Sequence, residues 1–365
     1  MSDTQAPALK EIFDAERFRH IAKEVSSIEK SFDAKKFLKL SLAGLDELSL
    51  MQRLRRMTEA LHATLPSDYG KSIEILRQLA PRINRSFVTV VLPDFVGLYG
   101  HDDFDVSMDA LKFFTTFGSA EFAIREFLRR DLKRTLKVMK TWSQDENEHI
   151  RRLASEGCRP RLPWSFKLDA LIADPSAVKP ILENLKADES LYVRKSVANH
   201  LNDITKDHPI WVLDYIESWS LENRHTAWIA KQALRTLIKK GDRRALAVIG
   251  AGEKPNVLVH DLVVNPQAIA LGERLNLSFR LESTSAKSQR LVVDYIVHYV
   301  KKSGETSGKV FKWKELTLEP HASVTFVRSQ SIRDFTTRIH HPGRHDVEIV
   351  VNGESLAKDF FILSR

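Results

Sequence analysis

The chain has 365 residues, 43% of them hydrophobic, so it can bury a substantial core and is long enough for two domains. It has no apolar run near the roughly 18 residues that cross a membrane, no apolar secretory signal at its start, and a single cysteine, which excludes an internal disulfide. The formal charge of +8, from 56 basic and 48 acidic residues, favours a polyanionic partner, and we expect a cytoplasmic protein.

Residues 1–250 are predicted to form one helix after another. Apolar residues recur at helical spacing in four segments, which are punctuated by Pro, Gly, Asp and Ser and cover residues 32–66, 71–83, 107–117 and 119–142. Residues 92–105 carry two glycines and no strong period, so we expect a loop there.

One helical pattern then appears twice within residues 145–209. A helix over residues 150–159 places Ile150 and Leu153 on its apolar side and Arg152, Glu156 and Arg159 on the opposite side. A shift of 43 positions repeats the pattern and puts Arg194 on Arg151, Lys195 on Arg152, Asn199 on Glu156 and Asn202 on Arg159.

A looser third copy covers residues 225–242 and puts Trp228, Gln232 and Arg235 at the three polar positions. Helical pairs that recur about every 40 residues are typical of HEAT or armadillo-like arrays, which line a concave surface with one face of each helix. The concentration of Arg and Lys on this face favours nucleic acid as the polyanion.

The helical pattern stops at a Gly and Pro cluster, so residues 251–256 are predicted to be a linker. Residues 257–365 contain about seven β-branched or aromatic runs separated by turn residues, which indicates an immunoglobulin-like β-sandwich. The predicted fold is therefore an α-solenoid of HEAT-like repeats followed by a β-sandwich. Two roles are open for this domain: its basic loops clamp DNA, or the domain is a passive appendage that only stabilises the protein.

Nucleotide-binding and metalloprotease motifs are absent, since the chain has no GxGxxG, P-loop, nucleophile elbow or HExxH. The histidines at 340, 341 and 345 flank a Pro-Gly turn and fit a solvated loop better than a metal site. We expect neither a metal nor another cofactor.

Glu156 is the acid that the pattern singles out, because it lies between Arg152 and Arg159 on one helical face. The alternative is an ordinary ladder of surface ion pairs. The following sequence, RPRLPW, ends the helix at a proline with Arg159 and Arg161 on either side of it, and presents Trp164 in a rigid turn. Trp164 either stacks on a base or packs between repeats.

Two further acids lie near this face. Asp203 follows Asn202 in the second copy and belongs either to the site or to a polar network at the helix end. Glu121 is expected in the first turn of a helix that Ser119 caps, where the helix dipole alone would explain it. Trp228 and Arg235 extend the stripe or pack between repeats.

The segments SMDALKFFTTFGSAEFAIREFL, HIRRLASEGCRPRLPW and YVRKSVANHLNDITKDHP resemble the bacterial HEAT-like-repeat DNA glycosylases of the AlkC type, which are relatives of the AlkD enzymes. The resemblance covers most of residues 1–250, and some members of the group carry a C-terminal immunoglobulin-like domain. It implies base excision repair: hydrolytic removal of cationic N-alkylated bases, chiefly 3-methyladenine, from duplex DNA without deep base flipping.

With this resemblance, we predict that Glu156 is the central carboxylate, that Glu121 and Asp203 support it, and that Trp164 lies against the lesion. The predicted DNA-binding residues are the cationic and aromatic side chains of the repeated face: Arg152, Arg159, Arg161, Arg194, Lys195, Trp228 and Arg235.

No lysine stands out as a Schiff-base nucleophile, so a monofunctional glycosylase is predicted. Its partner is double-stranded DNA with alkylated bases, with no membrane and no obligatory protein partner. In a bacterial cell it would be cytoplasmic and associated with the nucleoid when on DNA. The main alternative is a non-catalytic HEAT-repeat scaffold that binds DNA or an acidic protein.

Overall fold

The computed structural model describes residues 9–83, 86–335 and 338–365, and these residues form two compact units. The first unit contains residues up to His208 together with Ser220–Ala233, and the second contains Pro209–Trp219 together with Leu234–Arg365. None of the helices described in these ranges is both long and apolar enough to cross a membrane.

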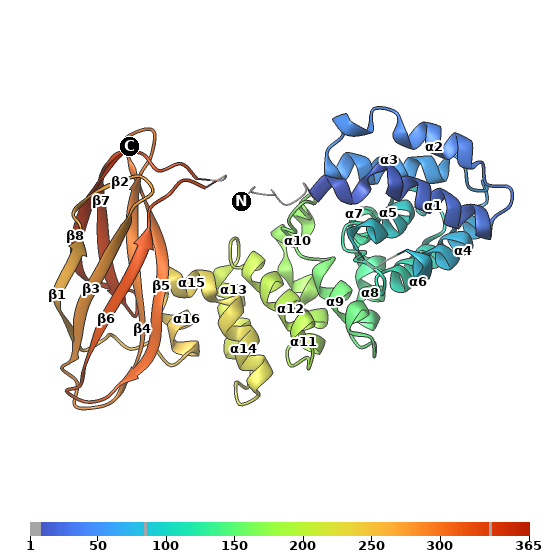
Figure 1. The fold of residues 1–365 in the computed structure, drawn as a ribbon. Helices are drawn as coiled ribbons and strands as arrows, with labels where there is room; N and C mark the ends of the chain where they lie inside the picture. Colours follow the sequence, from blue (N-terminus) through green and yellow to red (C-terminus); the bar gives the residue numbers. More distant parts are fainter. Residues whose placement is uncertain (1–8, 84–85, 336–337) are drawn as a thin grey trace. The chain divides into compact units, whose positions relative to one another are not determined.

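The first unit is helical, as the sequence predicts (Figure 1). Its α-helices are α1 (Ala15–Ile28), α2 (Ala34–Leu42), α3 (Leu50–His62), α4 (Tyr69–Leu79), α5 (Val91–Tyr99), α6 (Phe104–Phe114), α7 (Ile124–Arg130), α8 (Leu132–Trp142), α9 (Glu148–Glu156), α10 (Asp169–Ala173), α11 (Lys179–Leu185), α12 (Leu191–Ile204) and α14 (Arg224–Ala233). Short 3₁₀ helices lie at Leu9–Phe13, Leu45–Glu47, Ala80–Arg82, Phe87–Val90 and Pro175–Val178.

Short polar side chains define where these helices begin. Side-chain oxygens accept hydrogen bonds from the free N–H groups of the first turn, which stabilises each helix start. In this unit such caps are Asp14, Asp33, Asp68, Asp103, Asp131, Asn147 and Ser190.

The predicted loop at residues 92–105 is wrong, because most of it is α5 and the start of α6. Pro93 lies in the first turn of α5, where its missing N–H costs no hydrogen bond. Gly97 is needed for packing, since a Cβ there would lie 3.1 Å from the Cα of Ala123. The glycine that reads as a loop signal therefore allows α5 to approach the segment that leads into α7.

The repeated helices stack as the sequence repeat predicts. α9 packs against α12, and α12 packs against α14, so the three copies of the pattern are neighbours in space. Leu153, Val197 and Ile229 are fully buried on the apolar sides of the three helices. This arrangement confirms a stack of HEAT-like repeats.

The second unit joins a β-sandwich to three helices, α13 (Pro209–Glu217), α15 (Arg235–Lys239) and α16 (Arg243–Val248). The strands are β1 (Val257–Asn265), β2 (Ala268–Ala270), β3 (Arg274–Ser283), β4 (Gln289–Val300), β5 (Thr306–Leu318), β6 (Ser323–Ser331), β7 (Gly343–Val351) and β8 (Glu354–Ser364). Seven of these strands match the predicted runs, and the three-residue strand β2 was not predicted.

The strands form two sheets, β1-β3-β6 and β2-β8-β7-β4-β5. All pairs are antiparallel except β2 with β8. Alternate side chains of both sheets, among them Phe279, Tyr295 and Phe361, share one core, which confirms the immunoglobulin-like sandwich (Figure 1).

The change from helix to strand falls between Val248 and Val257, around the predicted linker at 251–256. Leu246 and Ala251 nevertheless pack against Val292 of β4, so α16 and the linker share an apolar cluster with the sandwich. The boundary between compact units accordingly lies earlier in the chain than the change of secondary structure.

Candidate active site

The site is built on the end of α9 and the loop that follows it. Asn147 caps the start of α9, and the helix ends at Glu156, three residues earlier than the predicted end at Arg159. Gly157 follows at the C-terminal end, where a Cβ would lie 2.4 Å from Cγ2 of Ile124, so close packing against α7 requires glycine at this position. The chain then turns, and the N–H of Leu168 bonds to the carbonyl of Pro160 at 3.1 Å, which closes a loop that contains Trp164.

Three carboxylates and two guanidiniums alternate across this region, and we call them the charge chain: Glu121, Arg152, Glu156, Arg159 and Asp203. Arg152 bonds to Glu121 on one side and lies 3.4 Å from Oε1 of Glu156 on the other. Arg159 bonds to the same Oε1 at 2.6 Å and to Oδ2 of Asp203 at 2.8 Å. With their ordinary charges, the five groups carry one net negative charge.

Glu156 is the middle carboxylate of the charge chain, and both of its oxygens are bonded. Oε1 pairs with the guanidiniums of Arg152 and Arg159. Oε2 accepts a hydrogen bond of 2.6 Å from the hydroxyl of Ser196 on α12. Burial opposes the positive charge of Arg159, but the carboxylates of Glu156 and Asp203 outweigh it and raise the pKa of Arg159. The charge chain therefore keeps a fixed geometry in a buried setting.

Glu121 has a more open position. It lies in a turn just before α7, which begins at Ile124, so its predicted place in the first turn of the helix is wrong. The hydroxyl of Ser119 and the guanidinium of Arg152 both bond to Oε2. Oε1 has no hydrogen-bond partner among the residues that the structure describes, so it is the carboxylate oxygen available to a ligand.

Trp164 projects from the loop after α9 with 67% of its surface exposed. Its backbone has a φ of 65°, a left-handed conformation that is uncommon for a large residue. The indole meets the ring of Phe87 edge-on, with 6.3 Å between the ring centroids. An aromatic face is therefore presented to solvent beside the charge chain.

Arg125, on α7, stabilises this loop through hydrogen bonds to its backbone. Its fully buried guanidinium donates hydrogen bonds to the carbonyls of Gly157 at 3.0 Å, Arg159 at 2.6 Å and Phe166 at 2.5 Å. Burial lowers the pKa of Arg125 to about 10, which leaves it positively charged at neutral pH. One side chain thus ties together both ends of the segment that carries Arg159 and Trp164.

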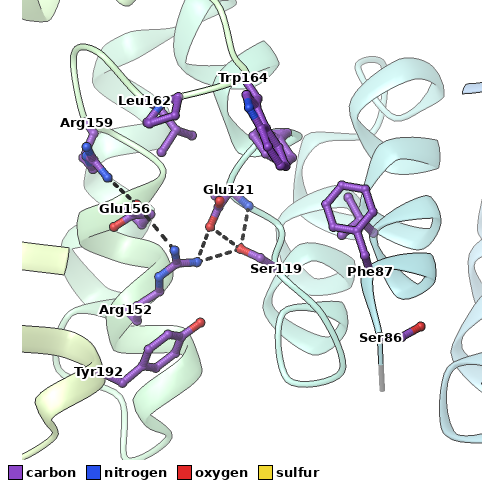
Figure 2. Close-up of a pocket in the computed structure, with 13 residues that line it drawn as sticks. Ser86, Phe87, Ser119, Glu121, Arg152, Glu156, Arg159, Leu162, Trp164 and Tyr192 are labelled. Atoms are coloured by element: carbon purple, nitrogen blue, oxygen red, sulfur yellow. Dashed lines mark hydrogen bonds and ion pairs between the residues drawn. The ribbon is translucent and has the colours of Figure 1, made fainter. Parts of the chain in front are cut away.

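These groups line a cavity of about 490 Å³, and Figure 2 shows Glu121 and Arg152 bonded to each other among its lining side chains, with Trp164 and Phe87 also in the lining. Its walls are Ser86, Phe87, Val90, Ser119, Glu121, Phe122, Arg152, Glu156, Arg159, Leu162, Pro163, Trp164 and Tyr192. Five predicted site residues line it: Glu121, Glu156, Trp164, Arg152 and Arg159.

The other predicted residues lie outside the cavity walls. Asp203 is next to them through its ion pair with Arg159, and it also pairs with Lys206 at 3.0 Å. Arg161 makes two bonds to the carboxylate of Asp207, at 2.9 and 2.7 Å.

The predicted DNA-binding residues of the second and third repeat copies do not line the cavity. Arg194 bonds to the carbonyls of Asp188 and Glu189 and lies over the ring of Trp228, while Lys195 is exposed on α12. Trp228 lies on α14 of the first unit, whereas Arg235 begins α15 in the second unit, with Leu234 between the two helices.

Several cavity residues carried no signal in the sequence. Tyr192 precedes the periodic positions of α12, and the Arg152 guanidinium lies 5.1 Å from its ring centroid. Burial raises the pKa of the Tyr192 hydroxyl. Phe87 comes from a distant 3₁₀ helix. Ser196 is not part of the cavity wall, and it bonds to Glu156 because α12 packs on α9. Only the three-dimensional fold brings these side chains together.

The residues that the structure describes contain no cluster of three or more His, Cys, Asp or Glu suited to a metal ion. The acids of the cavity are bonded to arginines, which compete with a cation for the same oxygens. His345, one of the three histidines near the Pro-Gly turn, is buried and stacks on Phe361, unlike the solvated loop expected for it.

Comparison with known proteins gives consistent matches to both parts of the chain. Residues 110–237 match a family model described as DNA alkylation repair enzyme, and residues 258–365 match the C-terminal Ig-like domain of uncharacterised protein YhaZ. The chain is 42% identical over 347 residues to the uncharacterized protein YhaZ of Bacillus subtilis, covering 95% of this chain and 96% of that protein.

A solved structure is similar over nearly the whole length. It is the Pseudomonas fluorescens alkylpurine DNA glycosylase AlkC bound to DNA containing an abasic site analog, with 60% sequence identity and a TM-score of 0.96. The match covers 98% of this chain and 100% of that one.

Proposed function

The chain belongs to the AlkC-type family of DNA alkylation repair enzymes, and from this premise we propose that it is an alkylpurine DNA glycosylase. It would hydrolyse the N-glycosidic bond of cationic alkylated bases in duplex DNA, chiefly 3-methyladenine. The observation that carries the proposal is the charge chain, which places the open carboxylate oxygen of Glu121 in a cavity edged by an exposed tryptophan.

The proposed chemistry begins with a leaving group that is already activated. An alkylated purine carries a positive charge, so breaking the glycosidic bond returns the electron pair to the base and neutralises it without a general acid. Positive charge then develops on the deoxyribose ring, and a nearby carboxylate stabilises it. Water adds to the anomeric carbon, and its proton passes to a carboxylate.

The contacts suggest how the acids share this work. Glu156, the proposed central carboxylate, is fully bonded to both arginines and Ser196, so its charge acts on the sugar cation through space. Glu121 has the open Oε1 and is placed to contact the sugar or the water. Asp203 supports Arg159 from outside the cavity.

Trp164 is the proposed contact for the lesion or its deoxyribose. Because 67% of the residue is exposed, its aromatic face meets a nucleotide at the protein surface, which supports excision without deep base flipping. Arg161, Arg194 and Lys195 are the proposed phosphate contacts. For Arg161 this requires exchange of its Asp207 partner for a phosphate.

The lining of the cavity supports a monofunctional enzyme. A glycosylase that also cleaves the strand needs an amine to form a Schiff base. The walls, taken from the described residues, include arginines but no lysine. We therefore propose that the reaction ends with release of the base and an intact abasic strand.

The direct test is incubation of the protein with methylated duplex DNA, followed by chromatography of the released bases. Release of 3-methyladenine without strand cleavage is the expected result. Tight binding with no base released from any adduct would instead support the alternative, a HEAT-repeat scaffold that binds DNA without catalysis.

A further inference from the structure

A second surface of the first unit has a different chemistry from the cavity. α8 packs against α11, and between them lies a groove of about 410 Å³. It is lined by five apolar residues and three lysines: Leu132, Leu136, Ala177, Pro180, Ile181, Lys133, Lys137 and Lys140.

The three lysines form a rim of unneutralised positive charge. Their spacing of four and three residues places Lys133, Lys137 and Lys140 on one face of α8, and all three are exposed. None of them has an ion-pair partner within the described ranges. Arg134 of the same helix, in contrast, pairs with Asp105 at 3.1 Å and lies over the ring of Phe104.

The floor of the groove is apolar. Leu136 and Ile181 are buried at its base, and Ala177 and Pro180 form an exposed side from the segment around the start of α11. An apolar hollow that remains open to water favours a ligand with apolar side chains. Phosphates satisfy the lysines but leave this floor uncovered, so nucleic acid fits the groove only in part.

We propose that this groove docks an acidic peptide segment of a partner protein, in which bulky apolar side chains alternate with carboxylates. The apolar side chains fill the floor, and the carboxylates pair with Lys133, Lys137 and Lys140. The groove lies on α8 and α11, whereas the charge chain uses α9 and α12. Docking is therefore separate from the proposed excision reaction and does not depend on it.

The test uses the full-length protein and a short fluorescein-labelled peptide in which Leu and Phe alternate with Glu and Asp. Binding is measured by fluorescence anisotropy. Lys137→Glu reverses one rim charge, and Lys23→Glu on α1 is the control with the same change of net charge on an exposed residue outside the groove. We expect Lys137→Glu to weaken binding by about fivefold to tenfold, and Lys23→Glu to change it by less than about twofold.

Ala177→Arg separates the peptide from nucleic acid, because it fills the groove with a side chain while adding positive charge. It should weaken peptide binding and leave binding of a single-stranded oligonucleotide equal or stronger. A peptide in which Ser replaces Leu and Phe should bind at least about tenfold more weakly than the apolar peptide.

Three results would overturn the proposal. These are equal effects of Lys137→Glu and Lys23→Glu, tighter peptide binding by Ala177→Arg, or equal binding of the Ser-substituted peptide. Weaker oligonucleotide binding by Lys137→Glu with unchanged peptide binding would assign the face to nucleic acid instead. Circular dichroism of each variant checks that the fold is intact.

Discussion

The acids of the cavity differ in how far their oxygens are committed to other groups. Glu156 bonds to Arg152, Arg159 and Ser196, so a substrate reaches its charge only through space or by displacing a partner. Glu121 shares Arg152 but keeps one open oxygen. A helical period over residues 150–159 predicts the cluster of Arg152, Glu156 and Arg159, and their ion pairs form although α9 ends at Glu156.

Arg125 connects the packing of the helices to the shape of the site. Arg125→Lys removes the fork that bonds three carbonyls, and we expect unfolding free energy to fall by about 3 kcal/mol, with slower excision because the Trp164 loop loosens.

Arg129→Lys is the matched control, because Arg129 also lies over Phe166 but its side chain is 60% exposed. Its cost in urea unfolding should stay below about 0.5 kcal/mol. Equal costs for the two variants would show that Arg125 does not hold the loop.

His200 contributes a pH dependence of stability. Burial and then the nearby charge of Arg159 lower the pKa of its imidazole from 6.5 to about 3. Because the unfolded chain binds a proton below pH 6.5 and the folded chain does not, stability is lost as pH falls from about 6.5 toward 3.

His200→Leu removes this proton linkage. Between pH 6 and 4, we expect the unfolding free energy of the wild type to fall more steeply than that of the variant, by about 1.4 kcal/mol per pH unit. Urea unfolding at a series of pH values measures both slopes. Parallel curves would mean that the folded protein accommodates a protonated His200.

At the scale of elements, glycines decide how closely the helices approach the cavity. Gly97 lets α5 reach Ala123, which follows Glu121 by two residues, and Gly157 lets the end of α9 reach Ile124 of α7. Sequence periodicity treats such glycines as breaks, which is why it predicts a loop at residues 92–105. Their role depends on which neighbour faces them, and a single sequence does not contain that information.

Gly97→Val tests this packing. A side chain at this position meets the backbone of Ala123, so we expect a loss of about 2 kcal/mol of unfolding free energy, measured by urea titration. Gly70→Ala in α4 is the control, because its Cβ would be no closer than 3.5 Å to Asp68; its effect should be below about 1 kcal/mol. A Gly97→Val protein of wild-type stability would show that α5 moves freely.

The periodicity of the sequence also does not predict where some helices end or where short strands form. Leu234 interrupts the third repeat copy although its apolar spacing continues, so this copy is divided between α14 and α15. β2 has only three residues and is a strand because β8 pairs with it. In both places contacts distant in sequence decide the local structure.

At the scale of the molecule, composition and periodicity were sufficient for a helical repeat followed by a sandwich, because both periods extend over many residues. They were not sufficient for the division into compact units. α16 bears Leu246, whose partner Val292 lies in β4, so a helix that resembles the solenoid packs with the sandwich instead. Removal of residues 255–365 would uncover this cluster, so substitutions in the sandwich loops test a DNA clamp more cleanly than truncation.

We propose that the buried carboxylate of Glu156 drives excision of an alkylated base. Glu156→Gln keeps the shape of the side chain and the arginines around it, but removes the negative charge between them. Glu16→Gln, on an exposed position of α1, is the matched control.

The decisive measurement is the single-turnover rate of 3-methyladenine release from methylated duplex DNA, made beside the dissociation constant for the same DNA. For Glu156→Gln we predict a rate about 100-fold lower with a dissociation constant within about threefold of the wild type, and no change for Glu16→Gln. An unchanged rate, or an equal loss of rate and affinity, would contradict the proposed role of Glu156.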